Sequence, residues 1–186
     1  PWDAVELPGQ FMENWCWEKQ AIKLFSAHFE TGESLPGEML DKLLAAKNFQ
    51  AGMQMLRQLE LALFDLKIHT EYESGEVFSI QEILNQVREQ VSVVPVAECN
   101  RFQNSFSHIF AGGYAAGYYS YKWAEVLSAD AFSKFEEQGV FNADTGDEFK
   151  RCILEKGGSE SPAELFSAFR GRPPKVDALL KHSGFV

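Results

Sequence analysis

The residue types best suited to catalysis gather in one short stretch near the middle of the chain, where a histidine and a glycine pair precede a run of tyrosines. These residues are His108, Gly112, Gly113, Tyr114, Tyr118, Tyr119 and Tyr121. Phenol and imidazole groups can donate hydrogen bonds to a substrate oxygen on which negative charge develops. If the chain is helical after Gly113, Tyr114, Tyr118 and Tyr121 share one face and Tyr119 points elsewhere. An aromatic stripe at this spacing also fits core packing, although each buried tyrosine would then need a partner for its hydroxyl group.

A second candidate is the acidic N-terminal segment, which contains Asp3, Glu6 and Glu13. In a helix, Glu6 and Glu13 lie on the same face and Asp3 lies about 60° away. Carboxylates on one face repel one another unless a cation or a proton lies between them. The spacing therefore fits either a metal-binding face or an ordinary solvated acidic face, and Pro8 removes one backbone donor from the segment.

The elements that would hold these residues have the pattern of helices. Apolar residues recur at a helical period, and the chain contains no convincing alternating strand pattern. Helices are expected over 9–29, from about 38, over 49–68, 79–91, 123–139 and 144–156, from 161, and after 174. Two capping boxes, Ser79 with Glu82 and Ser161 with Glu164, mark two of these starts. The sequence therefore predicts an all-α fold.

Composition and charge describe an acidic globular protein. The 186-residue chain is 45% apolar and 13% aromatic, and its net charge is −10. This charge argues against a nucleic-acid partner and against an anionic membrane, because both favour a basic protein surface. No apolar run approaches the roughly 20 residues of a membrane span. Because Cys16, Cys99 and Cys152 are widely spaced, we expect no disulfide framework and a cytoplasmic location.

A complete metal site is not visible in the sequence itself. The chain has four histidines, no two of them four residues apart, and no His-Glu-x-x-His motif. His28, His69 and His182 have polar neighbours and are expected at the surface.

Two separated segments resemble the thimet oligopeptidase family of zinc metallopeptidases, and in particular its bacterial oligopeptidase A branch. The first is Asp3-Ala-Val-Glu6-Leu-Pro-Gly-Gln-Phe-Met-Glu13-Asn-Trp, and the second joins His108-Ile-Phe-Ala-Gly-Gly-Tyr114 to Tyr118-Tyr119-Ser-Tyr121. The resemblance covers essentially the whole chain and implies that residues 1–186 are the C-terminal part of a peptidase catalytic domain. It further implies a mostly helical, two-lobed enzyme with a deep channel that admits short, unstructured peptides.

The resemblance also assigns roles residue by residue. Glu6 matches the family's third zinc ligand, and Asp3 and Glu13 are candidates for contacts around it. The family usually has serine where Gly9 stands here. In the second segment, the resemblance assigns a catalytic role to His108, Tyr118 and Tyr121. It assigns substrate binding to Gly112, Gly113 and Tyr114, where the family has a loop that closes over the peptide.

The same resemblance implies that the protein binds one zinc ion, is monomeric and cytoplasmic, and acts on short peptides. By the same resemblance, the two histidine ligands of the zinc ion and the general-base glutamate would lie in a His-Glu-x-x-His segment upstream of Pro1. This chain alone is therefore expected to be inactive. Two other interpretations stay open. One is a non-catalytic helical domain, derived from a peptidase, that binds peptides or proteins through its aromatic groove. The other is a structural helical bundle in which the Tyr–His cluster is buried core.

Overall fold

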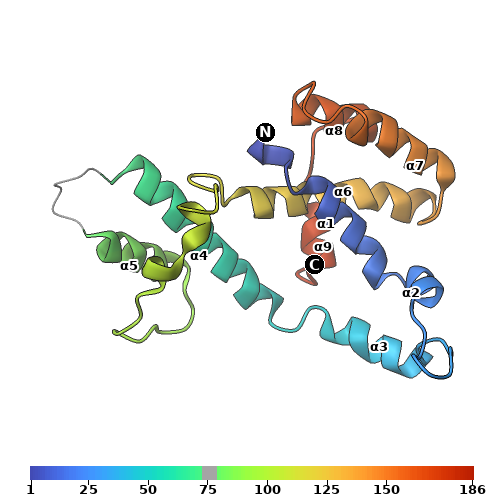
Figure 1. Cartoon of the computed structure of the whole chain (residues 1–186), viewed down its shortest axis with the longest axis horizontal. Coiled ribbons are helices and arrows are strands. Elements are labelled where there is room, and N and C mark those ends of the chain that lie inside the picture. Colours follow the sequence, from blue (N-terminus) through green and yellow to red (C-terminus); the bar gives the residue numbers. More distant parts are fainter. Residues whose placement is uncertain (73–78) are drawn as a thin grey trace. The chain divides into compact units, whose positions relative to one another are not determined.

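The computed structural model describes residues 1–72 and 79–186, and every regular element among them is helical (Figure 1). The α-helices are α1 (Leu7–Glu13), α2 (Lys19–Phe25), α3 (Gly37–Ala46), α4 (Ala51–Thr70), α5 (Ile80–Val91), α6 (Ser120–Gln138), α7 (Ala143–Phe149), α8 (Pro162–Arg170) and α9 (Asp177–His182). The predicted all-α fold class is confirmed for the described residues. None of their helices is long and apolar enough to cross a membrane.

Contacts divide the chain into two compact units. The first comprises Pro1–Phe49 and Trp123–Val186, and the second comprises Gln50–Lys122. The acidic N-terminal segment belongs to the first unit, whereas the histidine–tyrosine stretch belongs to the second.

The core of the first unit is rich in phenylalanine and anchors α1. Phe11 is almost fully buried and stacks on Phe149 of α7, with their ring centroids 3.9 Å apart. Trp15 packs edge-on against Phe11, and its indole N–H donates to the Val140 carbonyl oxygen at 2.8 Å. These contacts fix the helix that Glu6 precedes.

The single helix expected over 9–29 is wrong, because the structure breaks it into α1, a 3₁₀ turn (Asn14–Trp17) and α2. The Asn14 side-chain amide donates to the Phe11 carbonyl oxygen at 2.9 Å and to Ser128 Oγ of α6 at 2.9 Å. This amide therefore caps the end of α1 and ties it to α6. Glu18 then adopts an extended conformation, which separates the turn from α2.

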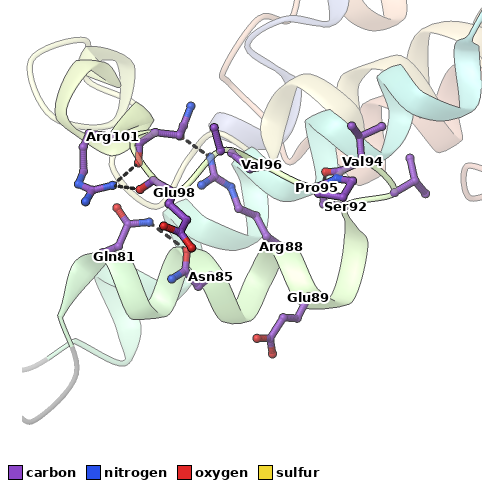
Figure 2. A pocket seen from close by; sticks show the side chains of 13 residues that line it. Gln81, Asn85, Arg88, Glu89, Ser92, Val94, Pro95, Val96, Glu98 and Arg101 are labelled. Carbon is purple, nitrogen blue, oxygen red and sulfur yellow. Dashed lines mark hydrogen bonds between the residues drawn. The ribbon is translucent and has the colours of Figure 1, made fainter.

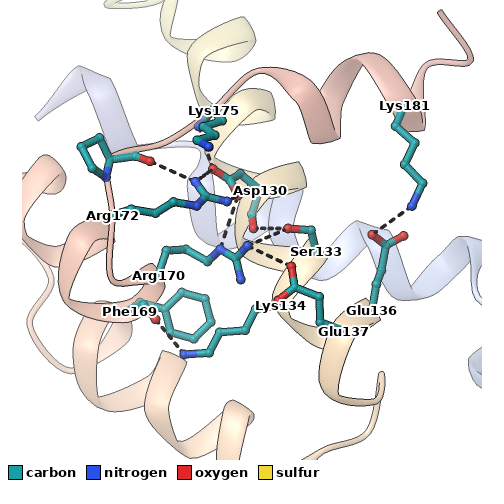
Figure 3. Close-up of polar contacts among 11 residues, drawn as sticks. Asp130, Ser133, Lys134, Glu136, Glu137, Phe169, Arg170, Arg172, Lys175 and Lys181 are labelled. Carbon is teal, nitrogen blue, oxygen red and sulfur yellow. Dashed lines mark hydrogen bonds and ion pairs between the residues drawn. The ribbon is translucent and has the colours of Figure 1, made fainter. Parts of the chain in front are cut away.

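A buried carboxylate joins α6 to the C-terminal segment of the first unit (Figure 3). Asp130 accepts two hydrogen bonds from the Arg172 guanidinium, at 2.6 and 2.7 Å, and one from the Lys175 backbone N–H at 2.7 Å. Burial favours the neutral acid, but these hydrogen bonds and the charges of Arg172 and Arg170 outweigh it, so the pKa of Asp130 lies below its ordinary value.

The second unit is built on α4 and α5, which lie side by side (Figure 1). Its core combines residues of both helices with residues of the 102–118 segment: Leu61, Phe64, Ile68, Ile83, Leu84, Phe106 and Ile109, with Phe102 and Tyr118 packed against them. Both predicted capping boxes are confirmed, since Ser79 and Ser161 each exchange hydrogen bonds with the glutamate three residues later. α5 therefore begins where the sequence indicates.

Candidate functional site

Glu6 lies immediately before α1 in helical conformation and is half-buried. Its backbone carbonyl accepts the N–H of Gln10 at 3.1 Å, and the next residue, Leu7, is buried in the core of the first unit. Pro8 falls in the first turn of α1, where a missing N–H removes no intrahelical hydrogen bond. The backbone at Glu6 is therefore well fixed.

The two other acidic residues of the segment are more exposed than Glu6. Asp3 is exposed in the 3₁₀ turn Trp2–Ala4, and Glu13 is exposed at the last position of α1. Seven residues of helix separate Glu6 from Glu13 by about 10 Å along the axis, although both are on one face. Glu13 therefore lies too far along the helix to share one ion directly with Glu6.

The prediction that Tyr114, Tyr118 and Tyr121 share one helix face assumed a regular helix after Gly113, and the structure has no such helix there. Residues 115–119 form turns, Ala116 has a positive φ of 52°, and α6 begins only at Ser120. The turns nevertheless bring the predicted residues together. Tyr114 and Tyr121 stack with ring centroids 5.0 Å apart, and Tyr118 lies 5.1 Å from Tyr121.

His108 joins this cluster from a separate 3₁₀ turn, Ser107–Ile109. Its ring centroid lies 5.9 Å from that of Tyr114, 6.0 Å from Tyr118 and 6.3 Å from Tyr121. His108 is exposed and the three tyrosines are half-buried. The cluster is therefore an accessible aromatic face of the second unit, which argues against the interpretation that these rings are buried core.

The glycine pair has a steric role in the loop between His108 and Tyr114. A Cβ atom at Gly112 would lie 2.7 Å from the His108 carbonyl oxygen, which is closer than real Cβ atoms come. Gly113 has a φ of 83°, which side chains disfavour. The same His108 carbonyl accepts the Tyr114 N–H at 3.0 Å. The two glycines thus let the backbone fold back and bring Tyr114 beside His108.

The sequence reasoning did not single out Asp65 and Gln58 of α4, which contact the tyrosine loop. Asp65 is fully buried, and its two carboxylate oxygens accept the backbone N–H groups of Ala116 and Tyr118, each at 2.9 Å. The Tyr118 hydroxyl donates to Gln58 Oε1 at 3.2 Å. An aspartate on the apolar face of a helix was the available signal, since such a carboxylate requires a polar partner.

Among the histidines predicted at the surface, His28 and His69 are exposed, whereas His182 is half-buried beside Glu136. His69 also has a partner, since its Nδ1 lies 2.9 Å from Asp65 Oδ1.

The Tyr118 phenol is held in its protonated form. Burial, and then the neighbouring Tyr121, raise the pKa of Tyr118 above its ordinary value, and the positive charge of Arg57 opposes them only in part. At neutral pH Tyr118 is therefore a hydrogen-bond donor.

A hollow of the second unit lies elsewhere, between α5 and the 92–101 segment (Figure 2). Its volume is about 630 Å³, and several of its polar side chains already bond to neighbouring groups. Arg88 donates to Asn100 Oδ1 at 2.9 Å and to Glu60 at 2.9 Å, and Arg101 donates to the Glu98 carbonyl. This hollow presents no converging set of catalytic groups.

Within residues 1–72 and 79–186, no group of three or more histidine, cysteine or acidic residues is arranged to hold a metal ion. Glu6 fits the part of a single ligand, because carboxylate oxygens bind zinc and this residue is only half-buried at a fixed helix start. A protein zinc site of three ligands that includes Glu6 would need at least one ligand from outside the described residues.

Comparison with known proteins supports the family resemblance seen in the two sequence segments. The model of peptidase family M3 matches residues 1–185. The chain belongs to this family. Oligopeptidase A of Salmonella typhimurium is 60% identical over 184 residues, and that of Escherichia coli is 59% identical over 184 residues; both alignments cover 99% of this chain. Saccharolysin of Saccharomyces cerevisiae is 35% identical over 185 residues, also 99% of this chain.

The resemblance to the oligopeptidase A branch is thus confirmed. The chain spans only about a quarter of the length of these relatives, 27% for both bacterial proteins and 26% for saccharolysin.

Proposed function

We propose that the full protein is a monomeric, cytoplasmic zinc metallopeptidase that hydrolyses short, unstructured peptides, and that this chain is the C-terminal part of its catalytic domain. The observation that carries the proposal is the convergence of His108 with three tyrosines on an accessible face, in a chain that matches a peptidase family from residue 1 to 185. Peptide substrates present carbonyl oxygens, and these can accept hydrogen bonds from a phenol O–H or an imidazole N–H.

Glu6 is assigned as one zinc ligand. The two histidine ligands and the general-base glutamate would come from the part of the protein outside this chain. A bound zinc ion would polarise the peptide carbonyl and lower the pKa of a water molecule to about 7. This chain's contribution is to fix the backbone that carries Glu6, because the neighbouring Leu7 and Phe11 are buried in the core.

Tyr118 is assigned as a hydrogen-bond donor to the substrate carbonyl oxygen as negative charge develops there, with Tyr121 and His108 beside it. Its raised pKa keeps the phenol protonated at neutral pH. Without substrate its hydroxyl donates to Gln58, so the substrate oxygen would replace Gln58 as acceptor. Tyr114, Gly112 and Gly113 are assigned to peptide binding, through the stacked ring and the folded loop.

The test is the substitution Tyr118→Phe in the full-length protein, assayed with short peptides. Loss of one donor to a developing oxyanion typically lowers kcat about 10²–10³-fold, and KM is expected to change much less because the donor acts mainly in the transition state. The matched control is Tyr72→Phe, which removes an exposed hydroxyl outside the cluster and should leave kcat unchanged.

An unchanged kcat in the Tyr118→Phe protein would remove Tyr118 from the catalytic role. A wild-type full-length protein that binds short peptides but hydrolyses none would instead support the non-catalytic peptide-binding domain.

A further inference from the structure

Helix α4 contacts Tyr118 at both ends of the residue. Gln58 accepts from its side-chain hydroxyl, and Asp65 accepts from its backbone N–H. Because these two α4 residues are seven positions apart, they lie on one face of the helix about two turns from each other. The hydroxyl is therefore held toward one end of this face and the backbone toward the other.

The backbone contacts come from the part of the loop that lacks helical hydrogen bonding. Gly117, Ser120 and Tyr121 donate their N–H groups to carbonyls three residues earlier, within the turns. The N–H groups of Ala116 and Tyr118 point instead at the carboxylate of Asp65. Ala116 has a positive φ of 52°, which is costly for a residue with a side chain, and the fixed acceptor for its N–H offsets part of that cost.

The partners of Asp65 differ from those of the other buried carboxylates. Glu60 pairs with the guanidinium groups of Arg57 and Arg88, and Asp130 pairs with those of Arg170 and Arg172. No arginine or lysine is paired with Asp65 in the described residues; it receives two loop amides and His69 Nδ1. Burying a carboxylate is costly unless hydrogen-bond donors or opposite charges compensate for the lost water. Its stabilisation is therefore tied to the conformation of the tyrosine loop.

We propose that Asp65 is a positioning residue that holds the 116–118 backbone in place and so fixes the Tyr118 hydroxyl for catalysis. This proposal rests on the proposed function, since Tyr118 is taken as the donor to the substrate. Asp65 itself touches no substrate and acts through the two backbone N–H groups. Its carboxylate gives each N–H its own oxygen, which an amide side chain cannot do.

The experiment combines amide hydrogen exchange with steady-state kinetics on full-length wild type, Asp65→Asn, Tyr118→Phe and the double variant. Asparagine keeps one acceptor oxygen and turns its NH₂ toward the other loop amide. In Asp65→Asn, exchange in peptides that cover 114–119 should rise about tenfold or more, and kcat should fall roughly 10–10²-fold with KM changed little, because small displacements of catalytic groups have effects of that order.

If Asp65 acts through Tyr118, the two substitutions are not additive, and Asp65→Asn should lower kcat much less in the Tyr118→Phe background than in wild type. The matched control is Asp130→Asn, which changes another buried aspartate that accepts a backbone N–H. Its exchange should rise around Lys175, while kcat stays at the wild-type value.

Unchanged exchange over 114–119 in Asp65→Asn would overturn the proposal. Raised exchange with a wild-type kcat would also overturn it, as would effects of the two substitutions on kcat that simply multiply. If Asp65→Asn does not fold, amide exchange in the wild-type protein tests the proposal. Slow exchange of the Ala116 and Tyr118 amides would support an anchored loop, and fast exchange would overturn it. Failure of the proposed function is distinguishable, because the wild-type protein would then hydrolyse no peptide whatever the exchange shows.

Discussion

The buried carboxylate of Asp130 gives the sharpest stability prediction for the first unit. The side chain of Asp130 is 1% exposed and that of Arg172 is 31% exposed, and two hydrogen bonds of 2.6 and 2.7 Å join them. Asp130→Asn removes the negative charge and one of the two oxygen acceptors while almost preserving the volume. The Lys175 N–H and the Arg172 guanidinium then compete for the remaining oxygen.

The magnitude follows from these contacts. Removing one partner of a fully buried ion pair costs about 3–5 kcal/mol. Water recovers part of this cost, because almost a third of the Arg172 side chain is exposed, and the asparagine oxygen still accepts one hydrogen bond. We therefore expect a loss of about 2–4 kcal/mol in the free energy of unfolding.

The effect should also depend on pH. The pKa of Asp130 in the folded protein lies below its unfolded value of about 3.9, so the unfolded state binds more protons between the two values. The stabilisation is complete above the unfolded pKa and is lost as pH falls through the lower folded pKa. Asp130→Asn should remove this part of the acid dependence.

The assay is urea unfolding of the full-length protein, followed by tryptophan fluorescence at pH 7 and at several values below pH 5. The exposed Asp147→Asn on α7 is the control and should change the unfolding free energy by less than about 0.5 kcal/mol. An Asp130→Asn protein that is as stable as wild type at pH 7, or that keeps the wild-type acid dependence, would refute this account.

Two further substitutions test the parts that hold the site residues. Phe11→Ala should destabilise the protein by about 3–5 kcal/mol, because Phe11 is 2% exposed and stacks on Phe149. Met12→Ala, at the neighbouring exposed position, should cost less than about 0.5 kcal/mol in the same urea assay. Equal costs for the two substitutions would contradict the packing described. Gly112→Ala should lower kcat/KM for short peptides, because its Cβ would displace the His108 backbone, whereas Gly146→Ala has open space around it and should leave kcat/KM at the wild-type value. A Gly112→Ala enzyme with wild-type kcat/KM would show that the loop tolerates the displacement.

Local signals in the sequence predicted much of the helical fold. The capping boxes at Ser79 and Ser161 depend on hydrogen bonds three residues apart, and both form. The expected helix over 49–68 is found as Ala51–Thr70, and the one from about Glu38 begins at Gly37. The break within 9–29 was missed because Asn14 ends α1 partly through Ser128, a residue 114 positions away.

The tyrosine site shows the same division between local and distant causes. The sequence predicted which tyrosines come together, but the prediction assumed that the segment is helical, and the structure shows turns there instead. The turns depend on Asp65, which is 51 and 53 positions away from the two N–H groups that it accepts. No period or motif within the segment encodes that contact. The roles of Glu6, His108 and the tyrosines stay predictions that the experiments above address.

The most direct test of the central claim is the zinc content of the full-length protein with Glu6→Gln. Glutamine keeps the size of the side chain but not the charge of a carboxylate ligand. We expect wild type to bind about one zinc ion per chain, and Glu6→Gln to lose most of it on dialysis along with peptide hydrolysis. Glu38→Gln, an exposed glutamate in the first turn of α3, should keep both. Wild-type zinc content and activity in Glu6→Gln would contradict the assignment of Glu6 as a ligand.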